Sequence, residues 1–187
     1  FFAKYLKDQA APALPEAIMF QTGSNQWKRY EQWPPVTQTM PESWHFSADG
    51  GLKAEPARVE PNASTFVEYV SDPAKPVPYS QRPIMGFWQG LPGSSDPRFG
   101  RAGVLWKVED QRFVSDRSDV VTFVSEPLTE AVEVSGQLTA HLFASTTGTD
   151  ADWVVKLIDV YPEQYAPQPE MGGYQLMIAD DVLRGKF

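Results

Sequence analysis

Proline is the residue that most limits how this chain can fold. Seventeen prolines and thirteen glycines are spread over 187 residues, without the fixed spacing of a repeat. Because proline lacks an amide hydrogen and fixes its φ angle, it interrupts helices and central strands. No stretch after residue 10 shows a sustained helical period. The sequence therefore predicts an all-β fold of short strands joined by turns, and it argues against disorder and against collagen.

The first eight residues are the exception to this pattern. Their apolar side chains, at positions 1, 2, 5 and 6, fall on one face of a helix, with Lys4 and Lys7 on the other. A helix of two turns is marginal in isolation and needs a surface to pack on. No capping residue precedes it. We expect residues 1–8 to be the end of a longer helix, and the chain to be a fragment.

Alternating apolar residues predict the strands. An apolar run at 17–20 ends at turn residues 22–25, and the strand 43–47 ends at Asp49-Gly50, a strong hairpin signal. Residues 27–33 and 72–100 are expected to be irregular. Further strands are expected at 64–70, 119–124, 131–144, 153–160 and 174–187, the last one entering through a strand or a turn. Within 131–144, the side chains expected to face inward are Val132, Val134, Leu138, Ala140 and Leu142.

Charge and composition exclude several classes of partner. Sixteen basic residues against 24 acidic ones give a net charge of −8, which repels phosphate backbones, so we expect no nucleic-acid partner. No apolar run approaches the roughly eighteen residues of a membrane span, so we expect no membrane partner. The absence of cysteine excludes disulfides and thiolate metal sites, but it does not select a cellular compartment.

The residues also give no sign of a catalytic centre. A serine hydrolase needs a nucleophile, a base and an acid, yet no G-x-S-x-G motif occurs. The two histidines, His45 and His141, are expected at a surface or an interface. The acidic pairs at 150/152 and 180–181 offer too few oxygens for calcium and are expected in solvated turns. We therefore predict no catalytic residue, no metal site and no cofactor.

Aromatic side chains keep a binding function open. Sugar faces pack on aromatic faces, and a β-sandwich could present such a platform. The other interpretation is that these rings fill the core or seal the domain against a neighbour. Composition alone leaves both interpretations open. The residues concerned are Trp27, Trp33, Trp44, Phe87 and Trp88.

Five motifs follow one another along the chain. They are Y-V-S-D-P-A-K-P-V-P-Y at 69–79, E-D-Q-R at 109–112 with R-S-D-V-V-T-F at 117–123, E-P-L at 126–128 with V-E-V-S-G at 132–136, D-A-D-W-V-V-K-L-I-D-V-Y-P at 150–162, and D-D-V-L-R at 180–184. In sequence and order they resemble the X-Pro dipeptidyl-peptidase/cocaine esterase family of serine hydrolases, with Asp181 in place of a glycine in a turn. The G-Y-Q-L-M-I segment at 173–178, with segments 76–79 and 81–84, is most similar to the α-amino-acid ester hydrolases. These are acylases of β-lactams and α-amino esters, of the glutaryl-7-ACA acylase type.

This resemblance implies a domain of a larger enzyme. Family members have an α/β-hydrolase domain with a helical cap, followed by a jelly-roll β-sandwich of the galactose-binding-like type. Residues 1–16 would be the last helix and linker of the hydrolase domain, and residues 17–187 the jelly roll, truncated at its C-terminal end. The serine, histidine and aspartate would lie in the missing domain and form an acyl-enzyme. No catalytic residue can therefore be assigned to this chain.

The resemblance also implies a role and a location. The jelly roll would pack on the α/β-hydrolase domain of the same protein and wall one side of the substrate cleft, with Phe87 and Trp88 as candidates for that wall. A homo-oligomer of the parent enzyme and a periplasmic or secreted location in a bacterium are also implied. The alternative is an independent carbohydrate-binding module. Apolar residues at the two ends of the chain favour a fragment of a hydrolase over an independent module. They are Phe1, Phe2, Tyr5, Leu6 and Phe187.

Overall fold

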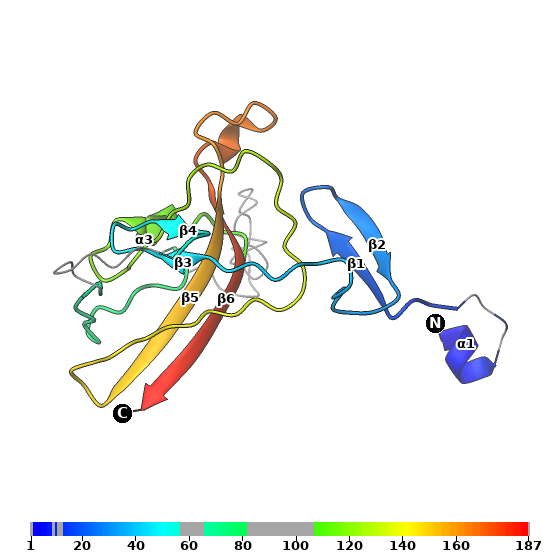
Figure 1. Cartoon of the computed structure of the whole chain (residues 1–187), viewed down its shortest axis with the longest axis horizontal. Helices are drawn as coiled ribbons and strands as arrows, with labels where there is room; N and C mark the ends of the chain where they lie inside the picture. The colour runs from blue at the N-terminus through cyan, green and yellow to red at the C-terminus, as the bar shows by residue number, and fades with distance from the viewer. Residues whose placement is uncertain (1, 9, 11–12, 57–65, 82–106, 187) are drawn as a thin grey trace, which may run out of the picture. The chain divides into compact units, whose positions relative to one another are not determined.

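The computed structural model describes residues 2–8, 10, 13–56, 66–81 and 107–186. The described elements are α1 (Phe2–Lys7), β1 (Ala17–Gln21), β2 (Gln26–Tyr30), β3 (His45–Phe46), β4 (Leu52–Lys53), α3 (Arg112–Ser115), β5 (Asp150–Val160), the 3-10 helix η1 (Pro169–Met171) and β6 (Gln175–Lys186) (Figure 1). Consecutive strands pair in antiparallel fashion as β1–β2, β3–β4 and β5–β6. The prediction of an all-β fold with a short N-terminal helix is confirmed. Within the described ranges, no helix is long and apolar enough to cross a bilayer.

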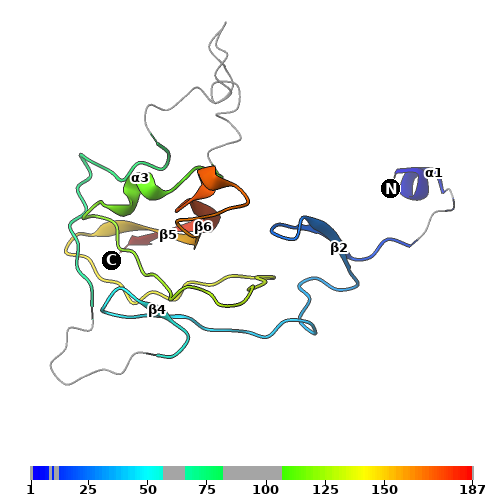
Figure 2. The same ribbon diagram turned by 90° about the horizontal axis from the view of Figure 1, so that it is seen from above.

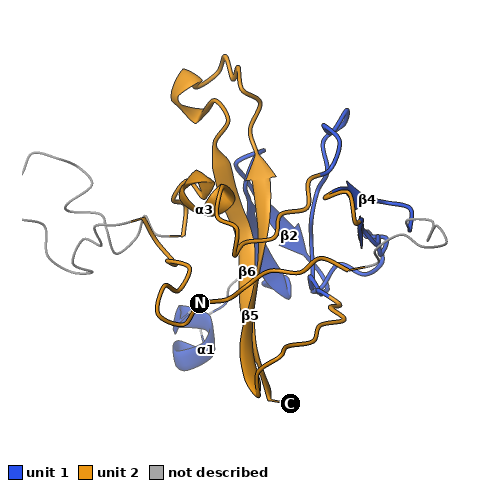
Figure 3. Cartoon of the chain, turned by 90° about the vertical axis from the view of Figure 1, so that its left-hand side faces the viewer, with its two compact units in different colours: residues 1–47, 51–57, 125–140 blue, residues 48–50, 58–124, 141–187 orange. Residues whose placement is uncertain are grey.

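The chain divides into two compact units (Figure 3). Unit 1 comprises residues 1–47, 51–57 and 125–140 and holds α1 and the hairpins β1–β2 and β3–β4. Unit 2 comprises residues 48–50, 58–124 and 141–187 and holds α3 and the β5–β6 ribbon. The two units do not test the domain boundary expected between residues 16 and 17, which stays a prediction.

The β1–β2 hairpin of unit 1 confirms the strand expected at 17–20. The register pairs Ala17 with Tyr30 at its open end. In the turn, Gly23 and Asn25 adopt φ angles of +81° and +54°, a region that glycine enters freely and asparagine tolerates. Trp27 lies within β2, so the irregular structure expected from residue 27 begins only after residue 30. Strands β3 and β4 flank the Asp49-Gly50 turn. Both hairpins of unit 1 therefore form where the local turn residues predict them.

The β5–β6 ribbon is the longest paired element of unit 2. Its register runs from Asp150 opposite Lys186 to Val160 opposite Gln175. The strand expected at 153–160 is confirmed, and residues 175–186 form one strand. The acidic pairs 150/152 and 180–181 were expected in solvated turns, but they lie inside β5 and β6, because the ladder runs through both. The helix α3 lies beside the end of the ribbon where β6 begins (Figure 2).

Three predicted strands do not form. Residues 66–70 and 131–144 carry no strand pairing, and residues 64 and 65 lie outside the described chain. Within 119–124 only Val124 forms an isolated bridge, and its N–H donates to the carbonyl of Gly50 at 2.9 Å. The side chains expected to face inward in the third segment are exposed: Val132, Val134, Leu138, Ala140 and Leu142. Alternation specifies which face a strand would bury, but a ladder also needs a partner strand for its backbone groups. The described residues supply no such partner.

Candidate functional site

The aromatic residues suggested as a platform are found with separate neighbours. Trp27 is 69% exposed and packs edge-on against Phe20, at 5.3 Å between ring centroids. Trp33 packs in the same manner against Tyr30, at 5.1 Å. The ring N–H of Trp44 donates a 2.9 Å hydrogen bond to the carboxylate of the residue two positions earlier. Phe87 and Trp88 lie outside the described residues.

The histidines and acidic pairs are placed as follows. His45 is half-buried in β3 opposite Lys53, and His141 is exposed in unit 2. Asp152 forms an ion pair with Arg184 across the β5–β6 ribbon, with Oδ1 at 2.6 Å from Nε. Over the described part of the chain, no three His, Cys, Asp or Glu side chains are grouped so that they could hold a metal ion.

Among the residues that the structure describes, the most buried polar side chain is that of Gln111, which is only 1% exposed. Its Nε2 donates a 2.8 Å hydrogen bond to the carbonyl of Glu109, and its Oε1 accepts a 2.7 Å hydrogen bond from Nζ of Lys156. Its backbone N–H donates to the carbonyl of Gln175 at 3.0 Å. The polar atoms of a buried amide need hydrogen-bond partners. Here the side-chain oxygen has its partner on β5 and the backbone N–H has its partner on β6, whereas Nε2 bonds within the segment itself. Gln111 therefore fastens the segment before α3 to the ribbon.

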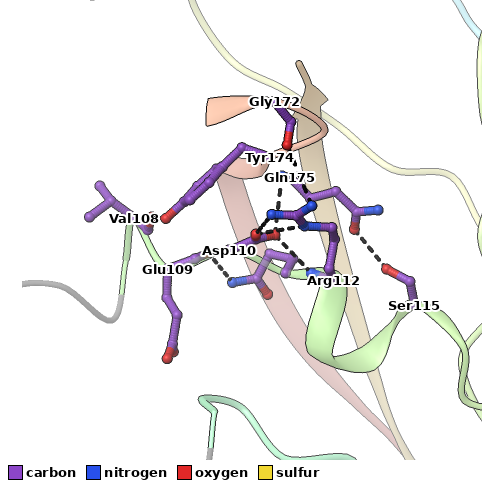
Figure 4. A network of polar contacts seen from close by, with 9 residues as sticks. Val108, Glu109, Asp110, Arg112, Ser115, Gly172, Tyr174 and Gln175 are labelled. Atoms are coloured by element: carbon purple, nitrogen blue, oxygen red, sulfur yellow. Dashed lines mark hydrogen bonds and ion pairs between the residues drawn. The ribbon is translucent and has the colours of Figure 1, made fainter. Parts of the chain in front are cut away.

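Asp110 and Arg112 flank this glutamine and form a second set of bonds (Figure 4). Nε of Arg112 donates to Oδ2 of Asp110 at 2.7 Å, while the backbone N–H groups of Arg112 and Gln175 donate to Oδ1 at 3.1 and 3.3 Å. Arg112 also donates to the carbonyl of Gly172 at 3.4 Å. Burial alone would raise the pKa of Asp110, but the hydrogen bonds from Arg112 and Gln175 together lower it below its usual range.

Two hydroxyl groups extend the network to its edges (Figure 4). Oγ of Ser115 donates to Oε1 of Gln175 at 2.8 Å, and the phenol of Tyr174 donates to the carbonyl of Val108 at 2.6 Å. Burial raises the pKa of Tyr174, and neighbouring carboxylates raise it further, so the phenol is a neutral donor at ordinary pH. The start of β6 and the segment 108–115 are thus joined along their length.

A third cluster lies further along the ribbon. The phenol of Tyr79 donates a 2.5 Å hydrogen bond to Asp180, and Nζ of Lys156 lies 4.6 Å from the centroid of the Tyr79 ring. Lys156 is opposite Asp180 in the β5–β6 register. Burial, followed by the hydrogen bond to Asp180 and the charge of that carboxylate, raises the pKa of Tyr79 to about 12. Burial lowers the pKa of Lys156, against the opposing charges of Asp180 and Glu109.

The cluster borders an open hollow of about 410 Å³. Its walls are mainly apolar, with two carboxylates among them. The residues that line it are Tyr79, Val154, Asp180, Asp181 and Val182.

The proline-rich motif is joined to the next motif by Arg117. Its guanidinium binds Asp119, with a 2.8 Å bond from Nε to Oδ1, and also donates to the carbonyl of Lys75 at 3.1 Å. Asp72 closes the preceding turn by accepting a 2.9 Å hydrogen bond from the N–H of Ala74. Two segments more than forty residues apart in sequence are therefore connected.

These contacts connect segments that are far apart in sequence. The polar groups of the network bond one another and the backbone of β6 and its flanking turn. Sequence reasoning did not single out Tyr79, Gln111 or Lys156. The available signal was their position in three of the quoted motifs, because each is a polar residue within a segment that resembles a family block.

Comparison with known proteins places this geometry in context. A family model described as the X-Pro dipeptidyl-peptidase C-terminal non-catalytic domain matches residues 10–184. Cocaine esterase of Rhodococcus sp. (strain MB1 Bresler) is 29% identical over 196 residues, which covers 100% of this chain and 29% of that protein.

Two solved structures are similar over nearly the whole chain. An aminopeptidase from a marine sediment archaeon, Thaumarchaeota archaeon, has a TM-score of 0.79 at 42% identity and covers 99% of this chain and 28% of its own. An α-amino acid ester hydrolase has a TM-score of 0.77 at 41% identity, with coverages of 98% and 29%. The chain therefore spans less than a third of the length of each of these relatives.

Proposed function

Because the chain belongs to the X-Pro dipeptidyl-peptidase C-terminal non-catalytic domain family, we propose that it is the C-terminal β domain of a larger serine hydrolase. The family resemblance inferred from the five motifs is thereby confirmed. The observation that carries the proposal is the family match over residues 10–184. The small share of each relative that the chain spans, 28–29%, leaves room for a catalytic domain in the same protein.

The reaction proposed for the whole protein is acyl transfer to water. The similar proteins are named as an esterase, an aminopeptidase and an ester hydrolase. Esters and amides are both cleaved when a serine attacks the carbonyl and water then releases the acyl group. Identities of 41–42% to the last two favour a substrate with an α-amino group next to that carbonyl. A periplasmic or secreted location and a homo-oligomeric parent belong to the same proposal.

The role proposed for this domain is to pack on the catalytic domain and to wall one side of its substrate cleft. Large exposed apolar side chains supply surface for such packing, among them Leu6 at 76% and Leu183 at 72% exposure. The polar network of unit 2 supplies a firm support, because a site is positioned best by rigid elements. Phe87 and Trp88 remain the candidates for the wall.

The test compares the isolated chain with the full-length protein that carries it. We expect the full-length protein to hydrolyse an amino-acid p-nitroanilide or an aryl ester and to be labelled by a fluorophosphonate, because that reagent reacts with an activated serine. The isolated chain should show neither activity nor labelling. A labelled serine within residues 1–187 would contradict the proposal, and so would a full-length protein that is neither active nor labelled.

A further inference from the structure

Two described segments, one ending at residue 81 and one that includes residues 109–111, lie against the β5–β6 ribbon and each other. The backbone N–H of Gln81 donates a 3.2 Å hydrogen bond to Oε2 of Glu109. Residues 82–106 lie outside the described chain, but both of their flanks are described. The ends of this long connection are therefore held within hydrogen-bonding distance of each other.

Lys156 of β5 contacts both flanks. On the outgoing side, its Nζ lies 4.6 Å from the centroid of the Tyr79 ring. On the returning side, the same Nζ donates a 2.7 Å hydrogen bond to Gln111, whose amide in turn binds the carbonyl of Glu109. Tyr79 is also fixed to the opposite strand through Asp180. One lysine is thus the common attachment point of two segments that are distant in sequence.

The environment of Lys156 explains why this attachment is specific. A half-buried ammonium group is costly unless charges, hydrogen bonds or an aromatic face replace its water. Here two carboxylates, one amide oxygen and one ring do so. If Lys156 only paired with Asp180 across the ribbon, it would need neither the Tyr79 ring nor the Gln111 amide. The arrangement also offsets the conformational entropy lost when the two ends of a long connection are brought together.

We propose that Tyr79, Glu109, Gln111 and Lys156 form a stem that holds the two ends of the connection 82–106 against the ribbon. Through it, they are positioning residues for substrate binding by the parent enzyme. This second step rests on the proposed function, because only a cleft-walling domain would transmit the change to substrate. The four residues act by fixing how the chain leaves and re-enters the sheet, and none of them contacts reacting atoms.

Limited proteolysis of the full-length native protein tests the stem. Trypsin has sites after Arg98 and Arg101, within the connection. In Lys156→Met the side chain keeps its length and loses its charge, so we expect cleavage at these two sites to be about ten-fold faster, since protease susceptibility follows local opening. The matched control is Arg184→Met, which removes another cation from the same ribbon, paired with Asp152 away from the stem. Equal rates in the two variants would overturn the proposal.

Two milder variants keep the test valid if Lys156→Met unfolds. Glu109→Ala removes the acceptor for the N–H of Gln81, whereas Glu109→Gln keeps an acceptor oxygen at the same place. Faster cleavage in the alanine variant, restored to the original rate in the glutamine variant, supports the stem. Cleavage that is equally fast in both, or unchanged in both, argues against it.

Kinetics of the same variants separate the stem from the proposed function. If both are right, Lys156→Met raises KM about five-fold while kcat changes less than two-fold, because the nucleophile lies in another domain and only binding is disturbed. Faster cleavage with an unchanged KM supports the stem and contradicts the cleft-walling role. Unchanged cleavage refutes the stem whatever happens to KM.

Discussion

The β1–β2 hairpin and the E-D-Q-R segment are organised in opposite ways. The hairpin pairs residues that are close in sequence and leaves its aromatic side chains outside, with Phe20 at 46% and Trp27 at 69% exposure. The E-D-Q-R segment buries Gln111 and joins residues 45 to 65 positions apart through side-chain hydrogen bonds. One region is built from local turn chemistry, the other from long-range polar contacts.

This difference shows what the family motifs encode. A hairpin needs only alternation and a suitable turn, which many sequences provide. A buried polar network needs each partner in place, because one missing group leaves the others desolvated and unpaired. Residues of the network, such as Asp110 and Arg112, belong to a quoted motif, whereas the hairpin belongs to none. The motifs therefore mark the positions where substitution should be most costly.

The largest effect is expected at Gln111. Gln111→Leu removes the acceptor of Lys156 and the donor to the Glu109 carbonyl, and should reduce the free energy of unfolding by about 2–3 kcal/mol. The same change in the hairpin, Gln26→Leu at an exposed position, should stay within about 0.5 kcal/mol. Urea unfolding of both variants measures the contrast. Equal losses would show that the two regions do not differ as described.

Acid should weaken the network in a manner that depends on Asp110. Its pKa is lowered in the folded state, so its contribution is complete above the unfolded pKa of about 3.9 and is lost as the pH falls through the lower folded value. Denaturant unfolding measured as the pH is lowered stepwise through the unfolded pKa should show stability decreasing with falling pH. In Asp110→Asn the decrease should be shallower. Identical slopes in the two proteins would contradict the assignment.

A smaller effect is expected from the exposed aromatic pair. Trp27→Ala removes the edge-to-face contact with Phe20, which is worth about 0.5–1 kcal/mol in a ring pair of this geometry. Thermal unfolding should therefore change little compared with Gln111→Leu. A loss as large as that of Gln111→Leu would mean that the hairpin also contributes to a cooperative core.

The smallest effect is expected from the ion pair that ties the hairpin to a distant segment. Nζ of Lys28 lies 2.9 Å from Glu133, and both side chains are substantially exposed. Lys28→Met should weaken folding less than Trp27→Ala, because exposed pairs contribute little. The difference in the free energy of unfolding between Lys28→Met and the unchanged protein should vanish at about 1 M salt, where the screening length is about 3 Å. A loss that persists at high salt would indicate packing by the lysine stem rather than charge.

The sequence predicts local features well and long-range ones poorly. The β1–β2 turn, the Asp49-Gly50 turn and the part of β5 from Trp153 to Val160 follow from turn residues and apolar runs, which act over a few positions. The segment 131–144 alternates perfectly well, yet no pattern within it can name a partner strand. The bond between Lys156 and Gln111 has no periodic signature, because hydrogen-bond partners that are 45 positions apart leave none.

The bulge in the ribbon has a practical consequence for exchanging parts between relatives. Between the pairs Leu157–Ala179 and Ile158–Met177, the β6 strand carries one additional residue, Ile178. Since side chains alternate between faces, this insertion inverts the phase of β6 on one side of it. The part of β6 next to the connection 161–174 therefore has an alternation of side chains that is out of phase with the rest of the strand. The connection could be replaced by one of another length, cut at the bulge, without turning any side chain of the Lys156 half to the wrong face.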